Sequence, residues 1–269
     1  GDRPIDYLVI NHMEPDHSGS IALIRKYYPE IRLVGNKKTF EMVEGFYGVP
    51  TEGDLVVAEG DSLPLGHHRL RFHLVPMLHW PETMVSYDET EHILFSGDAF
   101  GCFGALNGNV VDEQMDTTPY WPEMERYYAS ILGKFSPMVK RALAKLGGLQ
   151  IDMICSTHGP VWKKEVARAV GVYDRMSRGV TEPGVVVCYG SMYGNTQRVA
   201  EAVAAGAAEA GLRKVQRSGH RWTDLQRRSL PRGRGFASPA GRSRSQRPQT
   251  GLFRWLHLGQ CGLQDHCAL

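Results

Sequence analysis

The stretch INHMEPDHSGS, residues 10–20, joins two segments whose apolar patterns predict different secondary structure. The apolar run YLVIN before it, residues 7–11, predicts a buried strand, and SIALIRKYY after it, residues 20–28, has the apolar spacing of a helix. A loop that follows a strand and leads into a helix is where layered α/β folds keep functional side chains. The stretch therefore indicates both the fold class and the place where chemistry is expected.

Four metal-competent side chains lie within six positions of this loop: His12, Glu14, Asp16 and His17. His12 and Glu14 are two residues apart, so in an extended loop they project to one side. Asp16 and His17 can then face a second point nearby. A capped helix start with surface histidines is the alternative. Four such groups packed this closely repel or desolvate one another unless a cation is present, so the spacing predicts two adjacent metal ions.

Three later segments place further metal-competent side chains at the ends of apolar runs. LHW contributes His79, FSGDAFG contributes Asp98 and STHGPVW contributes His158. Each has another explanation when taken alone, as a core histidine or as a turn cap. Taken together, they predict the ligands that a two-metal site would still need.

Short apolar runs and amphipathic segments alternate from the first residue to about residue 176, which indicates a layered α/β architecture. A loop, MLHWPET at residues 77–83, is expected to lie between two of the strands. The expected strands are residues 7–11, 31–35, 70–76, 92–98 and the start of 151–159, and the expected helices are residues 20–28, 38–48, 120–146 and 163–178.

Length and composition limit the class of protein. The chain has 269 residues, of which 42% are hydrophobic, so it can bury one large core or two modest ones. No apolar run reaches the roughly 18 residues of a membrane span, and no basic segment leads into an apolar one, so a cytoplasmic location is expected. The five cysteines are scattered without a CxxC pair, which favours reduced thiols over disulfides or an iron-sulfur site.

A second candidate site follows the apolar strand predicted at residues 185–189. The loop SMYGNT lies between this strand and an alanine-rich helix, where backbone N–H groups and hydroxyls at a helix N-terminus form a nest for phosphate. Such a turn is weak evidence by itself. The candidate cofactor-binding residues are Ser191, Met192, Tyr193, Gly194, Asn195 and Thr196.

The last 57 residues differ in composition from the rest of the chain. Residues 213–269 carry a net charge of +10, from 12 basic and two acidic residues, whereas residues 1–212 carry −8, from 19 basic and 27 acidic residues. Out-of-frame translation of a GC-rich gene explains this tail most simply, and an arginine-rich nucleic-acid or membrane-surface arm is the alternative. Arginines without a helical stripe give only a nonspecific electrostatic contact, so no specific nucleic-acid partner is expected.

The order HxExDH, then a histidine, then the aspartate of GDAF and the histidine of THG resembles the metallo-β-lactamase-like domain of the flavodiiron proteins, or A-type flavoproteins. The β-lactamase and glyoxalase II branches usually have a histidine at the position of Glu14. A carboxylate there makes the site harder and suits iron better than zinc. The resemblance implies one iron on His12, Glu14 and His79, a second iron on Asp16, His17 and His158, and a bridge through Asp98.

The resemblance also implies the domain organisation. Residues 1–175 would form an αββα sandwich that lacks its N-terminal part, and residues 176–183 a linker. Residues 184–212 would be the first βα unit of a flavodoxin-like, doubly wound FMN domain, followed by the tail at residues 213–269. Compared with the family, we therefore expect a chain that is truncated at its N-terminus and shifted in frame after about residue 212.

The function that the resemblance implies is the reduction of O2 to water or of NO to N2O at a non-haem diiron centre. Electrons would come from a rubredoxin-like donor through FMN, in a head-to-tail homodimer. A dinuclear zinc hydrolase remains the alternative, and the preference between O2 and NO stays open. We also expect this chain to bind FMN weakly or not at all, because the loops that would hold the flavin ring are absent from the recognisable sequence. The fragment by itself is expected to be inactive.

Overall fold

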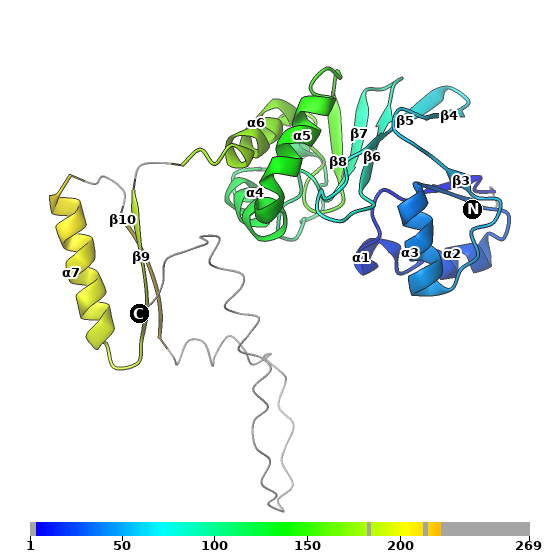
Figure 1. The fold of residues 1–269 in the computed structure, drawn as a ribbon. Helices are drawn as coiled ribbons and strands as arrows, with labels where there is room; N and C mark the ends of the chain where they lie inside the picture. Colours follow the sequence, from blue (N-terminus) through cyan, green and yellow to red (C-terminus); the bar gives the residue numbers. More distant parts are fainter. Residues whose placement is uncertain (1–3, 182–183, 212–214, 222–269) are drawn as a thin grey trace, which may run out of the picture. The chain divides into compact units, whose positions relative to one another are not determined.

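The computed structural model describes residues 4–181, 184–211 and 215–221, and Figure 1 draws their helices and strands along the chain. These residues divide into two units, of which the first ends at Val180 and the second begins at Thr181. Each unit is described by itself. Among the helices of these residues, none has the length and apolar character needed to cross a membrane.

The first unit begins with a three-stranded parallel sheet of order β1-β2-β3. Helix α3 starts where Asn36 Oδ1 accepts a hydrogen bond from the Thr39 N–H at 3.1 Å, and ends where Gly48 adopts a left-handed φ of 60°. The two strands and two helices predicted in this part are present, whereas β3 and α1 were not predicted. The elements are β1 (Tyr7–Val9), α1 (Pro15–Ser18), α2 (Ile21–Tyr27), β2 (Arg32–Gly35), α3 (Lys37–Tyr47) and β3 (Leu55–Val56).

A five-stranded sheet of order β4-β5-β6-β7-β8 follows, in which β7 and β8 are parallel and the other neighbours antiparallel. Its strands are β4 (Ser62–Leu65), β5 (His68–Leu74), β6 (Met84–Asp88), β7 (Ile93–Gly97) and β8 (Met153–Ser156). The sequence analysis missed β4 and β6. Strand β6 is entirely buried although it contains Ser86 and Asp88, because Ser86 donates a hydrogen bond to Asn11 and Asp88 accepts one from the Thr90 N–H.

Helices cover the face of the second sheet that points away from the first sheet. Figure 1 shows α4, α5 and α6 close together beside this sheet. Trp162, which lies between β8 and α6 in the chain and is fully buried, packs on Trp121 of α4 with ring centres 4.7 Å apart and donates a hydrogen bond from Nε1 to the Phe100 carbonyl at 2.9 Å. The helical segments are a 3-10 turn (Asp112–Gln114), α4 (Tyr120–Tyr127), a π turn (Tyr128–Leu132), a 3-10 turn (Gly133–Phe135), α5 (Ser136–Leu146) and α6 (Val166–Ser177).

Three hydrophobic clusters hold these layers together. Neighbouring residues of β2 point to opposite faces of the sheet. Leu33 therefore packs with Phe40 of α3, on the outer face. Val34 packs with Phe72 and Met84 of the second sheet. A third cluster fills the space between the second sheet and helices α4 to α6. The order helix, sheet, sheet, helix is the αββα sandwich predicted from the sequence.

The second unit is a strand, a helix and a strand: β9 (Val185–Ser191), α7 (Asn195–Glu209) and β10 (Val215–Arg221), with β9 and β10 parallel. The predicted strand and helix are present. Strand β10 lies in the stretch assigned to the tail. It was not predicted, because VQRSGHR lacks apolar alternation; the strand pairs with β9 through backbone hydrogen bonds. The rest of the predicted tail, residues 222–269, lies outside the described residues. Helix α6 reaches Ser177, two residues into the predicted linker.

Candidate metal centre

The loop after β1 is held against the second sheet before it turns into α1. The carbonyl of Asn11 accepts a hydrogen bond from the Met84 N–H at 3.0 Å, and its side-chain oxygen accepts one from Ser86 at 2.6 Å. Ser18 at the end of α1 donates to the Met13 carbonyl at 2.8 Å. An extended loop was expected at His12 and Glu14, with Asp16 and His17 turned toward a second point. In the structure, α1 starts directly after Glu14, and the helical turn directs Asp16 and His17 toward Asp98 and His158.

One group of ligand atoms lies around Glu14. The Nε2 atom of His12 is 3.4 Å from Glu14 Oε2, and the Nε2 atom of His79 is 3.2 Å from the same oxygen. Asp98 Oδ2 completes this group, at 3.0 Å from His79 Nε2 and 3.9 Å from His12 Nε2. Four side chains from three loops therefore converge on one point.

A second group lies around Asp16. The Nε2 atom of His158 is 3.4 Å from Asp16 Oδ2, and that of His17 is 3.5 Å from Asp16 Oδ1. The other oxygen of Asp98, Oδ1, is 2.8 Å from His17 Nε2 and 3.4 Å from His158 Nε2. The two oxygens of one carboxylate thus face two different groups of ligands. The structure brings all seven predicted ligands together.

The chemistry of these groups fits metal ions. Imidazole nitrogens and carboxylate oxygens meet here without a lysine or arginine among the contacts given above, and such donors bind iron or zinc. The Nε2 atom of His17 is buried and, although 2.8 Å from Asp98 Oδ1, has no hydrogen bond of suitable direction in the described part of the chain. Metal ligands point at the ion rather than at one another, so a close contact between His17 Nε2 and Asp98 Oδ1 without hydrogen-bond alignment is the arrangement of ligands around a cation.

Asp98 is fixed in its ionised form. Burial disfavours the charge, but the imidazoles of His17 and His79 and the hydroxyl of Thr157 outweigh burial and hold the pKa of this carboxyl well below its ordinary range. Thr157 donates to Asp98 Oδ1 at 2.9 Å. The Asp98 carboxylate in turn raises the pKa of the His17 imidazole against the effect of burial. Without a metal, the centre therefore retains a buried negative charge surrounded by histidines.

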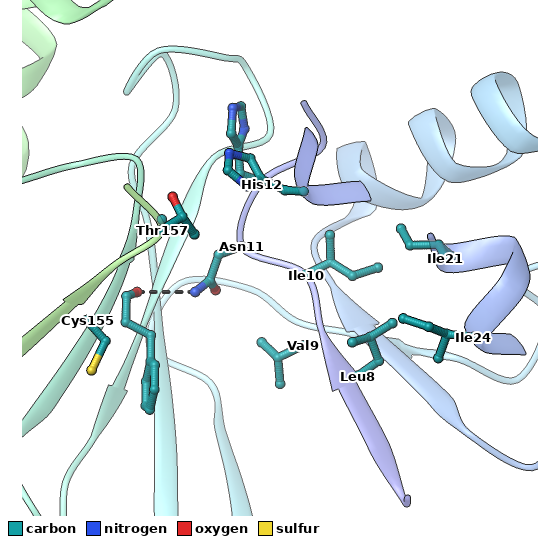
Figure 2. Close-up of a pocket in the computed structure, with 12 residues that line it drawn as sticks. Leu8, Val9, Ile10, Asn11, His12, Ile21, Ile24, Cys155 and Thr157 are labelled. Carbon is teal, nitrogen blue, oxygen red and sulfur yellow. Dashed lines mark hydrogen bonds between the residues drawn. The ribbon is translucent and has the colours of Figure 1, made fainter. Parts of the chain in front are cut away.

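Two openings adjoin the centre. A cavity of about 420 Å³ is bordered by Glu14, Asp16 and His158, and by the rings of Phe103 and Tyr127. The Tyr127 ring lies 5.7 Å from the His158 ring, centre to centre. Figure 2 shows a different pocket, which is also bordered by His12 and Thr157. Its volume is about 230 Å³. Apolar side chains of β1 and α2 line that pocket: Leu8, Val9, Ile10, Ile21 and Ile24.

Sequence reasoning missed Glu82, Phe103, Tyr127 and Thr157. Glu82 is buried, and its Oε1 lies 2.8 Å from His12 Nδ1 and accepts a hydrogen bond from the Met13 N–H at 2.9 Å. Burial disfavours its charge, but these two partners outweigh it and lower the pKa of the Glu82 carboxyl. The sequence offered one signal for Glu82, an acidic residue in the loop that also carries His79.

The predicted phosphate turn lies in the second unit, between β9 and α7. Gly194 has a left-handed φ of 84° and precedes α7, and its N–H donates to Ser191 Oγ at 2.9 Å. Met192 and Tyr193 are 60% and 84% exposed. The turn and the helix N-terminus are present as expected from the sequence, and the binding of phosphate by this turn stays a prediction.

Known proteins resemble this chain over most of its length. The model of the family described as ODP family beta lactamase matches residues 2–159. Among curated proteins, an anaerobic nitric oxide reductase flavorubredoxin from Escherichia coli is 34% identical over 208 residues, which cover 76% of this chain and 43% of that protein. The chain thus spans about half the length, or less, of the curated relatives that it matches.

Solved structures show the same likeness. The flavodiiron protein from Giardia intestinalis has a TM-score of 0.76 and 33% identity, over 80% of this chain and 53% of that chain. The rubredoxin oxygen:oxidoreductase from the anaerobe Desulfovibrio gigas has a TM-score of 0.75 and 27% identity, over 80% of this chain and 54% of that chain.

Proposed function

The chain belongs to the β-lactamase-like ODP family, and from this membership we propose that its seven clustered ligands hold two iron ions. His12, Glu14 and His79 would hold one ion, and Asp16, His17 and His158 the other. The observation that carries the proposal is the position of Asp98, because Oδ2 lies 3.0 Å from His79 and Oδ1 lies 2.8 Å from His17. A carboxylate shared in this way can bridge two cations.

The ligand type favours iron over zinc. Glu14 supplies a carboxylate to the first group, and harder oxygen donors suit an ion that alternates between the ferrous and ferric states. A dinuclear zinc hydrolase would use a similar centre to activate a hydroxide. It remains the second candidate because histidine and aspartate bind zinc as well as iron. Metal identity therefore separates the two functions.

We propose that the complete protein is an oxidoreductase that reduces O2 to water or NO to N2O. The names of the relatives support this, since one is a nitric oxide reductase and another a rubredoxin oxygen:oxidoreductase. Bound iron would supply one-electron redox chemistry and open coordination positions. The buried Asp98 carboxylate would offset positive charge, and Phe103 and Tyr127 would limit the entry of bulk water through the cavity that they border.

The remaining parts of the proposal concern electron supply. FMN would receive electrons from a rubredoxin-like donor, with its phosphate at residues 191–196, in a cytoplasmic head-to-tail homodimer. The left-handed Gly194 before α7 supports the phosphate site. Phosphate contacts alone leave the flavin ring in water, so we expect weak binding to this chain. Flavin absorbance retained after gel filtration tests this, and stoichiometric FMN would contradict the expectation.

Metal analysis of the full chain, purified after growth in iron-replete medium, tests the main proposal. We expect iron in both positions, and a higher zinc-to-iron ratio in Glu14→His after identical growth. Asp88→Asn is a matched control, because Asp88 is buried and pairs with His68 but touches none of the seven ligands. Zinc in both positions of the unaltered chain would support the hydrolase instead. Consumption of O2 or NO by the iron-loaded chain with a chemical reductant tests the activity separately.

A further inference from the structure

Glu82 is a fully buried acid directly behind one of the ligands. It lies in the loop between β5 and β6, three residues after His79, and its side chain has no exposed surface. Its Oε1 atom contacts His12 Nδ1 at 2.8 Å and accepts the Met13 N–H at 2.9 Å. The imidazole of His12 therefore lies between Glu82 on one side and Glu14 and Asp98 on the other.

The burial of Glu82 is costly for the fold by itself. A carboxylate removed from water needs partners for both oxygens, and Oε2 of Glu82 has no hydrogen-bond partner in the described part of the chain. A glutamine or an apolar residue would fill the same space without a buried charge. A carboxylate retained here despite this cost is therefore expected to serve its neighbour His12, whose Nδ1 it contacts.

The position of Glu82 is fixed from its backbone. Its carbonyl accepts a hydrogen bond from Asn36 Nδ2 at 2.5 Å, and Asn36 also caps α3 through the Thr39 N–H. The carboxylate is thus connected to the first turn of an 11-residue helix rather than to a free loop. A rigid acceptor of this kind can hold a ring in one orientation.

The contact also determines which nitrogen of His12 carries the proton. When Nε2 of a neutral imidazole holds a cation through its lone pair, the proton lies on Nδ1, and here Nδ1 of His12 faces Glu82 Oε1 while Nε2 faces Glu14 and Asp98. Within residues 4–181, His12 is the only histidine among the predicted ligands whose Nδ1 contacts a carboxylate. In the described structure, a buried carboxylate therefore contacts the outer nitrogen of a histidine in the first group of ligands, and of none in the second.

We propose that Glu82 is a positioning residue that sets the metal affinity of the His12, Glu14 and His79 group by holding His12 Nε2 toward the cation. This inference rests on the proposed two-metal centre. The group formed by Asp16, His17 and His158 has no contact with Glu82, so it should keep its affinity when Glu82 is changed.

The test compares Glu82→Gln and Glu82→Ala with the unaltered full chain by anaerobic titration of Fe²⁺ into metal-free protein, in competition with a chelator. Glutamine keeps the size of the side chain and can still accept the Met13 N–H, but it removes the charge. We expect one of two affinities to weaken about 10–100-fold in both variants, while the other is unchanged. Asp88→Asn, which alters a buried carboxylate paired with the half-exposed His68 at 2.7 Å, should leave both affinities unchanged.

A spectroscopic measurement separates positioning from general loss of structure. In zinc-loaded protein with 15N-labelled histidines, the His12 Nδ1 proton should be observed in the unaltered chain, and it should be lost or exchange rapidly in Glu82→Ala. Signals of His17 and His158 should not move.

Unchanged affinities in both variants would overturn the inference, and so would equal weakening of both metals with a lower unfolding temperature. If the unaltered chain takes up no Fe²⁺ at all, both the two-metal proposal and the role of Glu82 fail. Uptake of two Fe²⁺ by the unaltered chain and by Glu82→Gln with equal affinities would overturn only the role of Glu82.

Discussion

Two loops in this chain have the same local architecture and differ in their surroundings. Residues 10–14 lead from β1 into α1, and residues 192–194 lead from β9 into α7. In the first unit, side chains from the loops after β7 and β8 and from the loop before β6 converge on the turn, and Asp98 is 2% exposed. In the second unit, the hydrogen bonds of the described turn are local: Gly194 donates to Ser191 Oγ, and its carbonyl accepts the Arg198 N–H of the following helix. A strand-loop-helix turn becomes a site when segments distant in sequence complete it.

The largest expected effect concerns Asp98→Ala. Without the shared carboxylate, two cations would face each other without a negative charge between them, so we expect the full chain to lose both metals. Metal content after purification is the measurement. Ser191→Ala alters the corresponding turn of the second unit and should leave metal content unchanged. An Asp98→Ala protein that retains both irons would show that Asp98 does not bridge, and the contrast between the two turns would then fail.

The next effect concerns packing. Trp162 is fully buried, so Trp162→Ala should lower the free energy of unfolding of the first unit by about 3–5 kcal/mol. Val186 on β9 is 62% exposed, and Val186→Ala should change stability by less than about 0.5 kcal/mol. Urea unfolding followed by tryptophan fluorescence and by circular dichroism measures both. Similar losses of unfolding free energy in the two variants would contradict the difference in packing that the exposure of Trp162 and Val186 indicates.

A smaller effect concerns the backbone of the second turn. Gly194→Ala forces alanine to adopt a φ of 84°, which should destabilise β9 and α7 by about 1 kcal/mol. Gly206 lies inside α7, and a Cβ added there meets no atom within 4 Å. Gly206→Ala should therefore stabilise the helix by up to about 1 kcal/mol. Amide hydrogen exchange of α7 would reveal the opposite signs, and a common sign would refute the role assigned to the turn.

The smallest effect concerns pH in the metal-free protein. The folded-state pKa of His17 is raised, so its contact with Asp98 stabilises the fold fully below the ordinary histidine pKa of about 6.5 and is lost as pH rises through the raised value. Asp98 stays ionised over this interval because its pKa is lowered. The urea midpoint should thus decrease as pH rises from about 6.5 through the raised pKa of His17. His17→Gln should show a smaller fall, and an equal fall in both proteins would contradict this assignment.

The sequence was sufficient for elements with clear apolar periodicity, including β1, β2, α3 and α7. It was insufficient where polar residues are buried with partners distant in sequence. Strand β6 was not predicted, because it contains polar residues whose partners are distant, such as Ser86, which bonds to Asn11 75 residues away. Glu82 was missed for the same reason, since its partners His12 and Met13 are about 70 positions earlier. The seven ligands were accessible from the motif, whereas the side chains that orient them depend on tertiary structure.

The parallel pairing of β7 with β8 has a consequence for the order of folding. Ile93 pairs with Met153, so the chain must close a long crossover through α4 and α5 before this pair forms. The β1-β2-β3 sheet is complete by Val56 and has shorter connections. Contacts between distant residues form slowly, so we expect His158 to be the last ligand to arrive during refolding. Stopped-flow metal uptake should then lag behind formation of the first sheet.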